Sequence, residues 1–208
     1  MILFYYLNNT FEKDPTSNAR EALIEIYTKL RPGEPATEEG SRNLMFQKYF
    51  DKKKTIYTGN PCSENSLKVD SADKKEFGLS KNKKLVLFVM GSLGSGTMNK
   101  FLVSIMDKFN NKDYEIIFVT GKDSFDEINK NKFPENVKVV PYINNLTRVM
   151  KVTDLMVSRA GASTLSEVIA LNVPTILIPS PFVTNNHQYK NALDLKEKNA
   201  CVLIEEKD

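Results

Sequence analysis

The sequence predicts an α/β fold, a Rossmann-like parallel sheet with helices on both faces, preceded by a small helical segment. Three observations lead to this expectation. Beyond Lys84, short apolar runs alternate with helical patterns, the runs are continuously apolar, and glycine-rich turns follow two of them. A continuous apolar run is typical of a strand buried on both faces, and regular alternation of strands and helices is typical of a parallel sheet.

The helical segment comes first along the chain. Residues 19–31 place apolar side chains at three- and four-residue spacing, which predicts a helix. Two prolines and a glycine within Arg31–Pro35 end this helix, and a second helix is expected from Thr37. A helix pair of this size buries little apolar surface and is only marginally stable alone. Residues 60–83 are polar and rich in lysine, with a short helix expected at 71–77.

The alternating region supplies the sheet and the helices that cover it. Strands are expected near residues 85–90, 115–119, 137–140, 154–157, 175–178 and 201–204. Helices are expected near residues 97–109, 124–131, 145–151, 163–171 and 187–199. In a sheet of this kind ligands bind at the carboxyl ends of the strands, so the turns that follow the strands are the candidate sites.

Composition excludes several classes of function. The 208 residues are 41% hydrophobic and 26% charged, with a formal net charge of +3, which is ordinary for a soluble globular protein and too small to predict a nucleic-acid partner. Cys62 and Cys201 lie far apart, which argues against a disulfide scaffold or a zinc site and fits a reducing cytosol. The apolar opening, Met1–Leu7, is too short for a signal peptide or a membrane span.

Two strand–turn–helix segments are candidate phosphate-binding turns. The first is Gly91-Ser-Leu-Gly-Ser-Gly96, which is neither a G-x-G-x-x-G nor a Walker sequence, so a tight turn without a ligand is an equal alternative. The second is Ser158-Arg-Ala-Gly-Ala162, where Gly161 allows a ligand to approach the backbone at a helix start. Glu167 follows in that helix and could accept two hydrogen bonds from a ribose diol. Thr164-Leu-Ser-Glu167 also fits a capping box, and the pattern alone favours that alternative.

His187 is the chain's single histidine and is expected to begin a helix beside Gln188. A lone histidine is usually structural or merely exposed at the surface. Here it follows two asparagines at the end of a strand, and such a polar set suits the recognition of sugar hydroxyls, which both donate and accept hydrogen bonds.

Several motifs in a fixed order resemble one family. They are Thr58-Gly-Asn-Pro61, the two turns above, Pro141-Tyr-Ile143, Ser166-Glu167, Asn186-His-Gln188 and Asn191-Ala192. Residues 54–208 thereby resemble the C-terminal, donor-binding domain of the bacterial peptidoglycan N-acetylglucosaminyltransferases, a family with the GT-B fold. That family transfers N-acetylglucosamine from its UDP conjugate to undecaprenyl-pyrophosphoryl-muramyl-pentapeptide, converting lipid I to lipid II.

The resemblance implies a set of contacts with UDP-N-acetylglucosamine. Ser92, Leu93 and Gly94 would face the phosphates, and Glu167 would hold the ribose hydroxyls. The backbone of Ile143 would meet the uracil, while Ile143 is also expected to be a buried residue at a strand end. Arg159 would pair with phosphate or form a salt bridge across the sheet end. The full expected set is Ser92, Leu93, Gly94, Ile143, Arg159, Gly161, Ala162, Glu167, His187 and Gln188.

The resemblance also implies what this chain lacks. No cofactor and no metal are expected, and the chain has no Asp-x-Asp motif. The family's candidate base, its acceptor site for the lipid-linked muramyl-pentapeptide and its membrane contact belong to an N-terminal domain without a counterpart here. The chain alone is therefore expected to be inactive as a transferase, and the intact family works at the cytoplasmic face of the membrane. The alternative is a non-catalytic UDP-sugar-binding domain.

The first part of the chain resembles a different protein. Glu21–Ala36 and the stretch through Lys53 are similar to a fragment of the bacterial RNA polymerase β subunit. Residues 1–53 and 54–208 are therefore expected to derive from two different proteins. The fusion is either natural or arose during assembly of the sequence. A polymerase-associated module is a further functional alternative, which the absence of a nucleic-acid-binding charge pattern disfavours.

Overall fold

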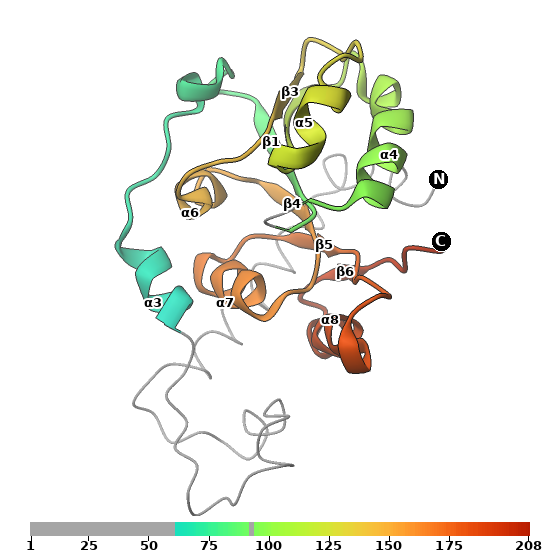
Figure 1. Ribbon diagram of the computed structural model, residues 1–208. Helices are drawn as coiled ribbons and strands as arrows, with labels where there is room; N and C mark the ends of the chain where they lie inside the picture. Colours follow the sequence, from blue (N-terminus) through green and yellow to red (C-terminus); the bar gives the residue numbers. More distant parts are fainter. Residues whose placement is uncertain (1–60, 92–93) are drawn as a thin grey trace, which may run out of the picture.

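The computed structural model describes residues 61–91 and 94–208, and in this part of the chain it is an α/β unit built on one parallel sheet (Figure 1). The strands run β1 (Lys84–Val89), β2 (Tyr114–Val119), β3 (Val137–Val140), β4 (Leu155–Ser158), β5 (Thr175–Leu177) and β6 (Val202–Leu203). Their order across the sheet is β3-β2-β1-β4-β5-β6, and every neighbouring pair is parallel. From β1 the strands are added outward to β3 on one side, and from β4 to β6 on the other side. The boundary between β1 and β4 is therefore the switch point, where such folds bind ligands.

Helices cover both faces of the sheet. They are α3 (Pro61–Lys68), α4 (Gly96–Ile105), α5 (Lys122–Ile128), α6 (Leu146–Met150), α7 (Ala162–Leu171) and α8 (His187–Glu197). Short 3₁₀ helices occur at η4 (Lys74–Phe77), η5 (Met106–Phe109) and η6 (Thr184–Asn186). Figure 1 shows α4 and α5 on one side of the sheet and α6, α7 and α8 on the other.

The core has two halves because successive strand residues point to opposite faces. In β1, Leu85 and Leu87 belong to a cluster with residues of α6, α7 and α8. Val86 and Phe88 belong to a second cluster with residues of α4, η5 and α5. All four of these side chains are buried, which explains why the strand is apolar without interruption.

The predicted order of strands and helices is confirmed, with differences at the ends of elements. The helix expected at 97–109 divides into α4 and the 3₁₀ helix η5, and the helix expected at 71–77 is the shorter η4. Helix α3 was not predicted. Residues 1–60, including the expected helix pair at 19–31 and from Thr37, lie outside the described residues. Within the described ranges, no helix has the length and apolar character needed to span a membrane.

Candidate nucleotide-binding site

The first glycine-rich turn lies between β1 and α4, against the end of β2. Gly94 has a φ of +76°, and a Cβ at this position would lie 2.2 Å from the carbonyl oxygen of Thr120. Its amide donates to the Gly91 carbonyl over 3.1 Å. The fold itself therefore requires glycine at position 94. The predicted contact residues Ser92 and Leu93 lie outside the described residues.

The second turn lies between β4 and α7. Gly161 is the N-cap of α7, with φ −71° and ψ 143°, a conformation that any residue adopts. Among the described residues a Cβ at position 161 would approach only the Thr164 hydroxyl oxygen, at 3.8 Å. The fold therefore leaves open space here and does not demand glycine. The helix begins at Ala162, which is exposed, and the N-cap gives its first amides no side-chain acceptor.

Glu167 lies in the second turn of α7 and is half-buried. The capping-box alternative is wrong, because α7 starts at Ala162 rather than near Thr164 and has no capping side chain. The Thr147 hydroxyl, from α6, donates to Glu167 Oε1 over 3.5 Å, at the long limit of a hydrogen bond. Burial raises the pKa of the Glu167 carboxyl, and the Thr147 hydrogen bond opposes this in part. The carboxylate is thus desolvated and only weakly paired.

Arg159 forms the salt bridge that the sequence offered as the alternative to a phosphate contact. Its Nη1 lies 2.8 Å from Glu206 Oε2 and donates to the Ile178 carbonyl over 2.9 Å. Glu206 Oε2 accepts no aligned hydrogen bond from the described residues, so its contact with Nη1 is a close ion pair. Nη2 donates to the Ser95 hydroxyl over 3.1 Å. Arg159 is only 7% exposed, and its guanidinium contacts these three protein partners; its predicted contact with phosphate stays a prediction.

Ile143 lies in the loop after β3, and Gln188 lies at the start of α8. Ile143 follows β3 and is 8% exposed, packed in the same cluster as Leu165, so its expected burial is confirmed. Gln188 lies in the first turn of α8, and its Oε1 accepts from the Ser180 amide over 2.9 Å. The side-chain amide of Asn191, one turn further, donates to the Ala160 carbonyl over 3.1 Å, which fixes α8 against the second turn.

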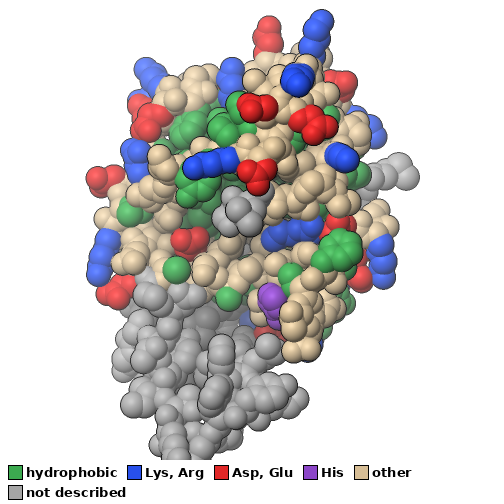
Figure 2. All heavy atoms as spheres, viewed as in Figure 1, with side chains coloured by type: hydrophobic (Ala, Val, Ile, Leu, Met, Phe, Trp, Pro, Cys, Tyr) green, Lys and Arg blue, Asp and Glu red, His purple; other side chains and the backbone are tan. Residues whose placement is uncertain are grey.

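His187 is partly exposed and begins α8, as the sequence predicts. Its Nδ1 lies 2.9 Å from the Thr184 carbonyl, a local contact that orients the ring. The purple side chain in Figure 2 is this histidine. On the face drawn there, Lys and Arg side chains are interspersed with Asp and Glu, without a surface patch of one sign among the described residues.

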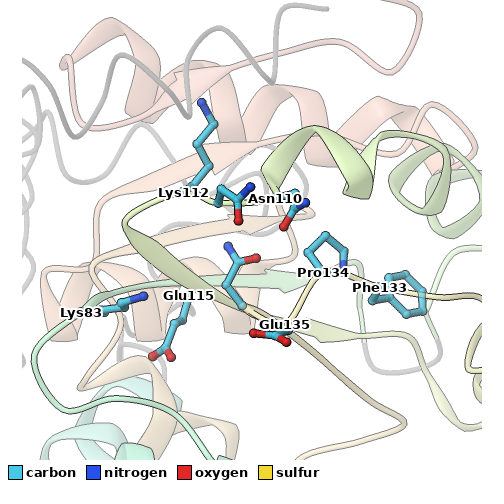
Figure 3. A pocket seen from close by; sticks show the side chains of 9 residues that line it. Lys83, Asn110, Lys112, Glu115, Phe133, Pro134 and Glu135 are labelled. Carbon is cyan, nitrogen blue, oxygen red and sulfur yellow. The ribbon is translucent and has the colours of Figure 1, made fainter.

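The opposite end of the sheet, at the amino ends of the strands, has a hollow whose described lining includes charged side chains and no glycine-rich turn. Near the amino ends of β1, β2 and β3 an open hollow of about 650 Å³ is lined mostly by polar residues, with Phe133 and Pro134 on one side (Figure 3). Both signs of charge line it, with Lys83 and Lys112 beside Glu115 and Glu135. Glu115 is engaged, since its Oε2 accepts from the Ser80 amide over 2.8 Å. This hollow lies away from both glycine-containing turns and contains none of the residues predicted for the site.

The fold and the position of the turns define this molecule as a domain of the Rossmann-like class. The profile of the family described as "Glycosyltransferase family 28 C-terminal domain" matches residues 85–208. The chain therefore belongs to that glycosyltransferase family.

Two curated relatives indicate which enzymes share this domain. Over 165 residues the chain is 42% identical to the UDP-N-acetylglucosamine–N-acetylmuramyl-(pentapeptide) pyrophosphoryl-undecaprenol N-acetylglucosamine transferase of Bacillus cytotoxicus, covering 77% of this chain and 45% of that enzyme. Its identity to the enzyme of the same name from Halalkalibacterium halodurans is 42% over 168 residues, covering 77% and 46%. The chain thus spans less than half the length of these relatives.

Solved structures agree with the fold. The structure of Acinetobacter baumannii MurG matches with a TM-score of 0.56 and 25% identity, covering 64% of this chain and 40% of that one. The calicheamicin glycosyltransferase CalG4 also has a TM-score of 0.56, at 14% identity, covering 80% and 38%, which supports the fold alone. The predicted fold class, one half of a GT-B glycosyltransferase, is confirmed.

Proposed function

We propose that this chain is the donor-binding half of an N-acetylglucosaminyltransferase of peptidoglycan synthesis and that it binds UDP-N-acetylglucosamine at the carboxyl end of the sheet. The half-buried carboxylate of Glu167 is the observation that supports this most strongly. It is desolvated, it does not cap its own helix, and a long hydrogen bond from Thr147 is its one described contact. A ribose diol would supply the two hydrogen bonds that such an acceptor lacks.

Other groups beyond the carboxyl ends of the strands fit the remainder of a nucleotide sugar. The first amides of α4 and α7 have no side-chain cap, so they can bind the diphosphate together with the partial positive charge of each helix start. The loop at Ile143, where Tyr142 and Asn144 are exposed on either side of the buried isoleucine, would offer backbone groups to the uracil. Gln188 offers the sugar a side-chain amide whose oxygen is fixed on Ser180.

The relatives also suggest an acceptor substrate and a place of action for the transfer reaction. The enzymes named above are transferases to the pyrophosphoryl-undecaprenol-linked muramyl-pentapeptide, and we assign that acceptor to the protein of which this chain forms a part. Catalysis would occur at the cytoplasmic face of the membrane, between this domain and a partner domain. Residues 54–208 form the donor domain in this proposal, while the likeness of residues 1–53 to a polymerase fragment stays a prediction.

Calorimetric titration of the purified 208-residue chain with UDP tests the proposal. We expect saturable binding with a Kd below about 1 mM, and weaker binding of uridine, because uridine lacks the diphosphate that the helix starts would bind. ADP, which has the same diphosphate and a different base, is the control for base recognition and should bind more weakly than UDP. A well-folded chain that binds no UDP at millimolar concentration would contradict the proposed function.

A further inference from the structure

Arg159 is a buried arginine that joins three segments at the carboxyl end of the sheet. It extends from the end of β4 to the Ile178 carbonyl at the end of β5, to Glu206 beyond β6, and to the Ser95 hydroxyl beside α4. The Glu206 side chain is itself 12% exposed, so the ion pair is largely shielded from water. An arginine with its donors directed at three partners has a fixed head group that is not free to follow a ligand.

Ser95 is the partner whose position bears on ligand binding. It is the N-cap of α4, in extended conformation, and serine is among the residues that most often cap a helix start. Its hydroxyl nevertheless makes no capping hydrogen bond, and instead it accepts from Arg159 Nη2 over 3.1 Å. The Ser95 backbone carbonyl still accepts the Asn99 amide over 2.7 Å, so the helix begins normally while its side-chain cap is diverted.

We propose that Arg159 is a positioning residue that holds the Ser95 hydroxyl away from the start of α4 and so leaves the first amides of that helix for a diphosphate. The inference rests on the proposed function and adds that the helix amides bind the diphosphate while Arg159 keeps them accessible. Arg159 acts through Ser95 and does not itself contact phosphate. Glu206 neutralises the buried guanidinium and keeps it aimed away from the ligand. Without the arginine, the hydroxyl would turn onto the amides and compete with the phosphate oxygens for the same donors.

The test asks whether Ser95→Ala restores the UDP affinity that Arg159→Lys loses. The Kd of the full chain is measured for UDP and for uridine. Lysine in Arg159→Lys keeps the charge beside Glu206 but lacks the planar fork that reaches Ser95 as well. We expect UDP affinity to fall about 3- to 10-fold, the equivalent of one hydrogen bond, with uridine affinity unchanged. The double variant Arg159→Lys/Ser95→Ala should return to within about twofold of the unmodified chain, because the competing hydroxyl is gone. Ser95→Ala alone should bind UDP normally.

Each other outcome overturns the inference. If Arg159 contacts phosphate directly, Ser95→Ala rescues nothing and Glu206→Gln, which releases the guanidinium, strengthens UDP binding. If Arg159 only supports the fold, its replacement weakens UDP and uridine equally and lowers the Tm in step. Should Arg159→Lys fold poorly, Arg159→Ala with and without Ser95→Ala gives the same comparison. A chain that binds neither ligand overturns the proposed function together with this inference, whereas normal binding without rescue overturns the inference alone.

Discussion

Replacing Glu167 with alanine should weaken UDP binding by about 5- to 150-fold, corresponding to ~1–3 kcal/mol for the lost hydrogen bonds to the ribose. The folded state should not suffer, because the carboxylate caps no helix and its contact with Thr147 is long. Burial raises the pKa of this carboxyl, so the ionised form is disfavoured in the folded protein and costs stability at neutral pH. Glu167→Gln should accordingly unfold at the same or a higher temperature than the unmodified chain.

The raised pKa of the Glu167 carboxyl also predicts how ligand binding depends on pH. The ionised carboxylate accepts two hydrogen bonds from the diol, whereas the protonated acid accepts fewer, so binding weakens as pH falls through the raised pKa. The loss should begin above the range of an ordinary glutamate, whose reference pKa is 4.5. Uridine is the suitable probe, because it has no phosphate that titrates in this range. An affinity for uridine that is independent of pH, or equal in Glu167→Ala, would remove Glu167 from the site.

Gly94→Ala should strongly destabilise the folded domain. The φ of +76° disfavours any L side chain, and the added Cβ would lie 2.2 Å from the Thr120 carbonyl oxygen, a backbone atom that cannot turn aside. We expect a loss of about 2–4 kcal/mol in the free energy of unfolding, seen as a Tm lower by roughly 5–15 °C. An unchanged Tm would show that the first turn has a different conformation in solution.

Gly161→Ala is the matched control for Gly94→Ala, because it adds the same methyl group to the other turn. Position 161 has ordinary extended backbone and open space, so the Tm should change little or rise slightly. UDP affinity should nevertheless fall, because the methyl group occupies the approach to the start of α7. Full UDP affinity in Gly161→Ala would mean that the ligand does not approach this turn.

The sheet and its helices could be predicted because their signal is local. Continuous apolar runs such as 85–90 specify strands buried on both faces, and periodic patterns such as 163–171 specify the covering helices. Helix α3 was missed for a tertiary reason. Its sequence is mostly polar, and it is held by contacts with α7, among them a hydrogen bond of 3.1 Å from the Ser63 hydroxyl to the Ser166 carbonyl.

The sequence predicts which residues form the candidate site, but not the contacts among them. The turns at Gly94 and Gly161 follow strands, which is a local pattern that points to the carboxyl end of the sheet. A salt bridge of Arg159 was one of two alternatives, but its partner Glu206 lies beyond another strand, and no spacing in the sequence identifies it. Thr147 was likewise missed, since its contact with Glu167 arises only when α6 and α7 pack together.

The most direct test of the account is to map which end of the sheet binds UDP by amide chemical-shift changes during a titration. We predict shifts at Gly94, Ile143 and Ala162, which follow the carboxyl ends of β1, β3 and β4. Asn110 and Asn136, which line the polar hollow at the opposite end, should remain unshifted. Shifts confined to that hollow, or an unchanged spectrum at saturating UDP, would contradict the assignment of this domain as the donor-binding half of a glycosyltransferase.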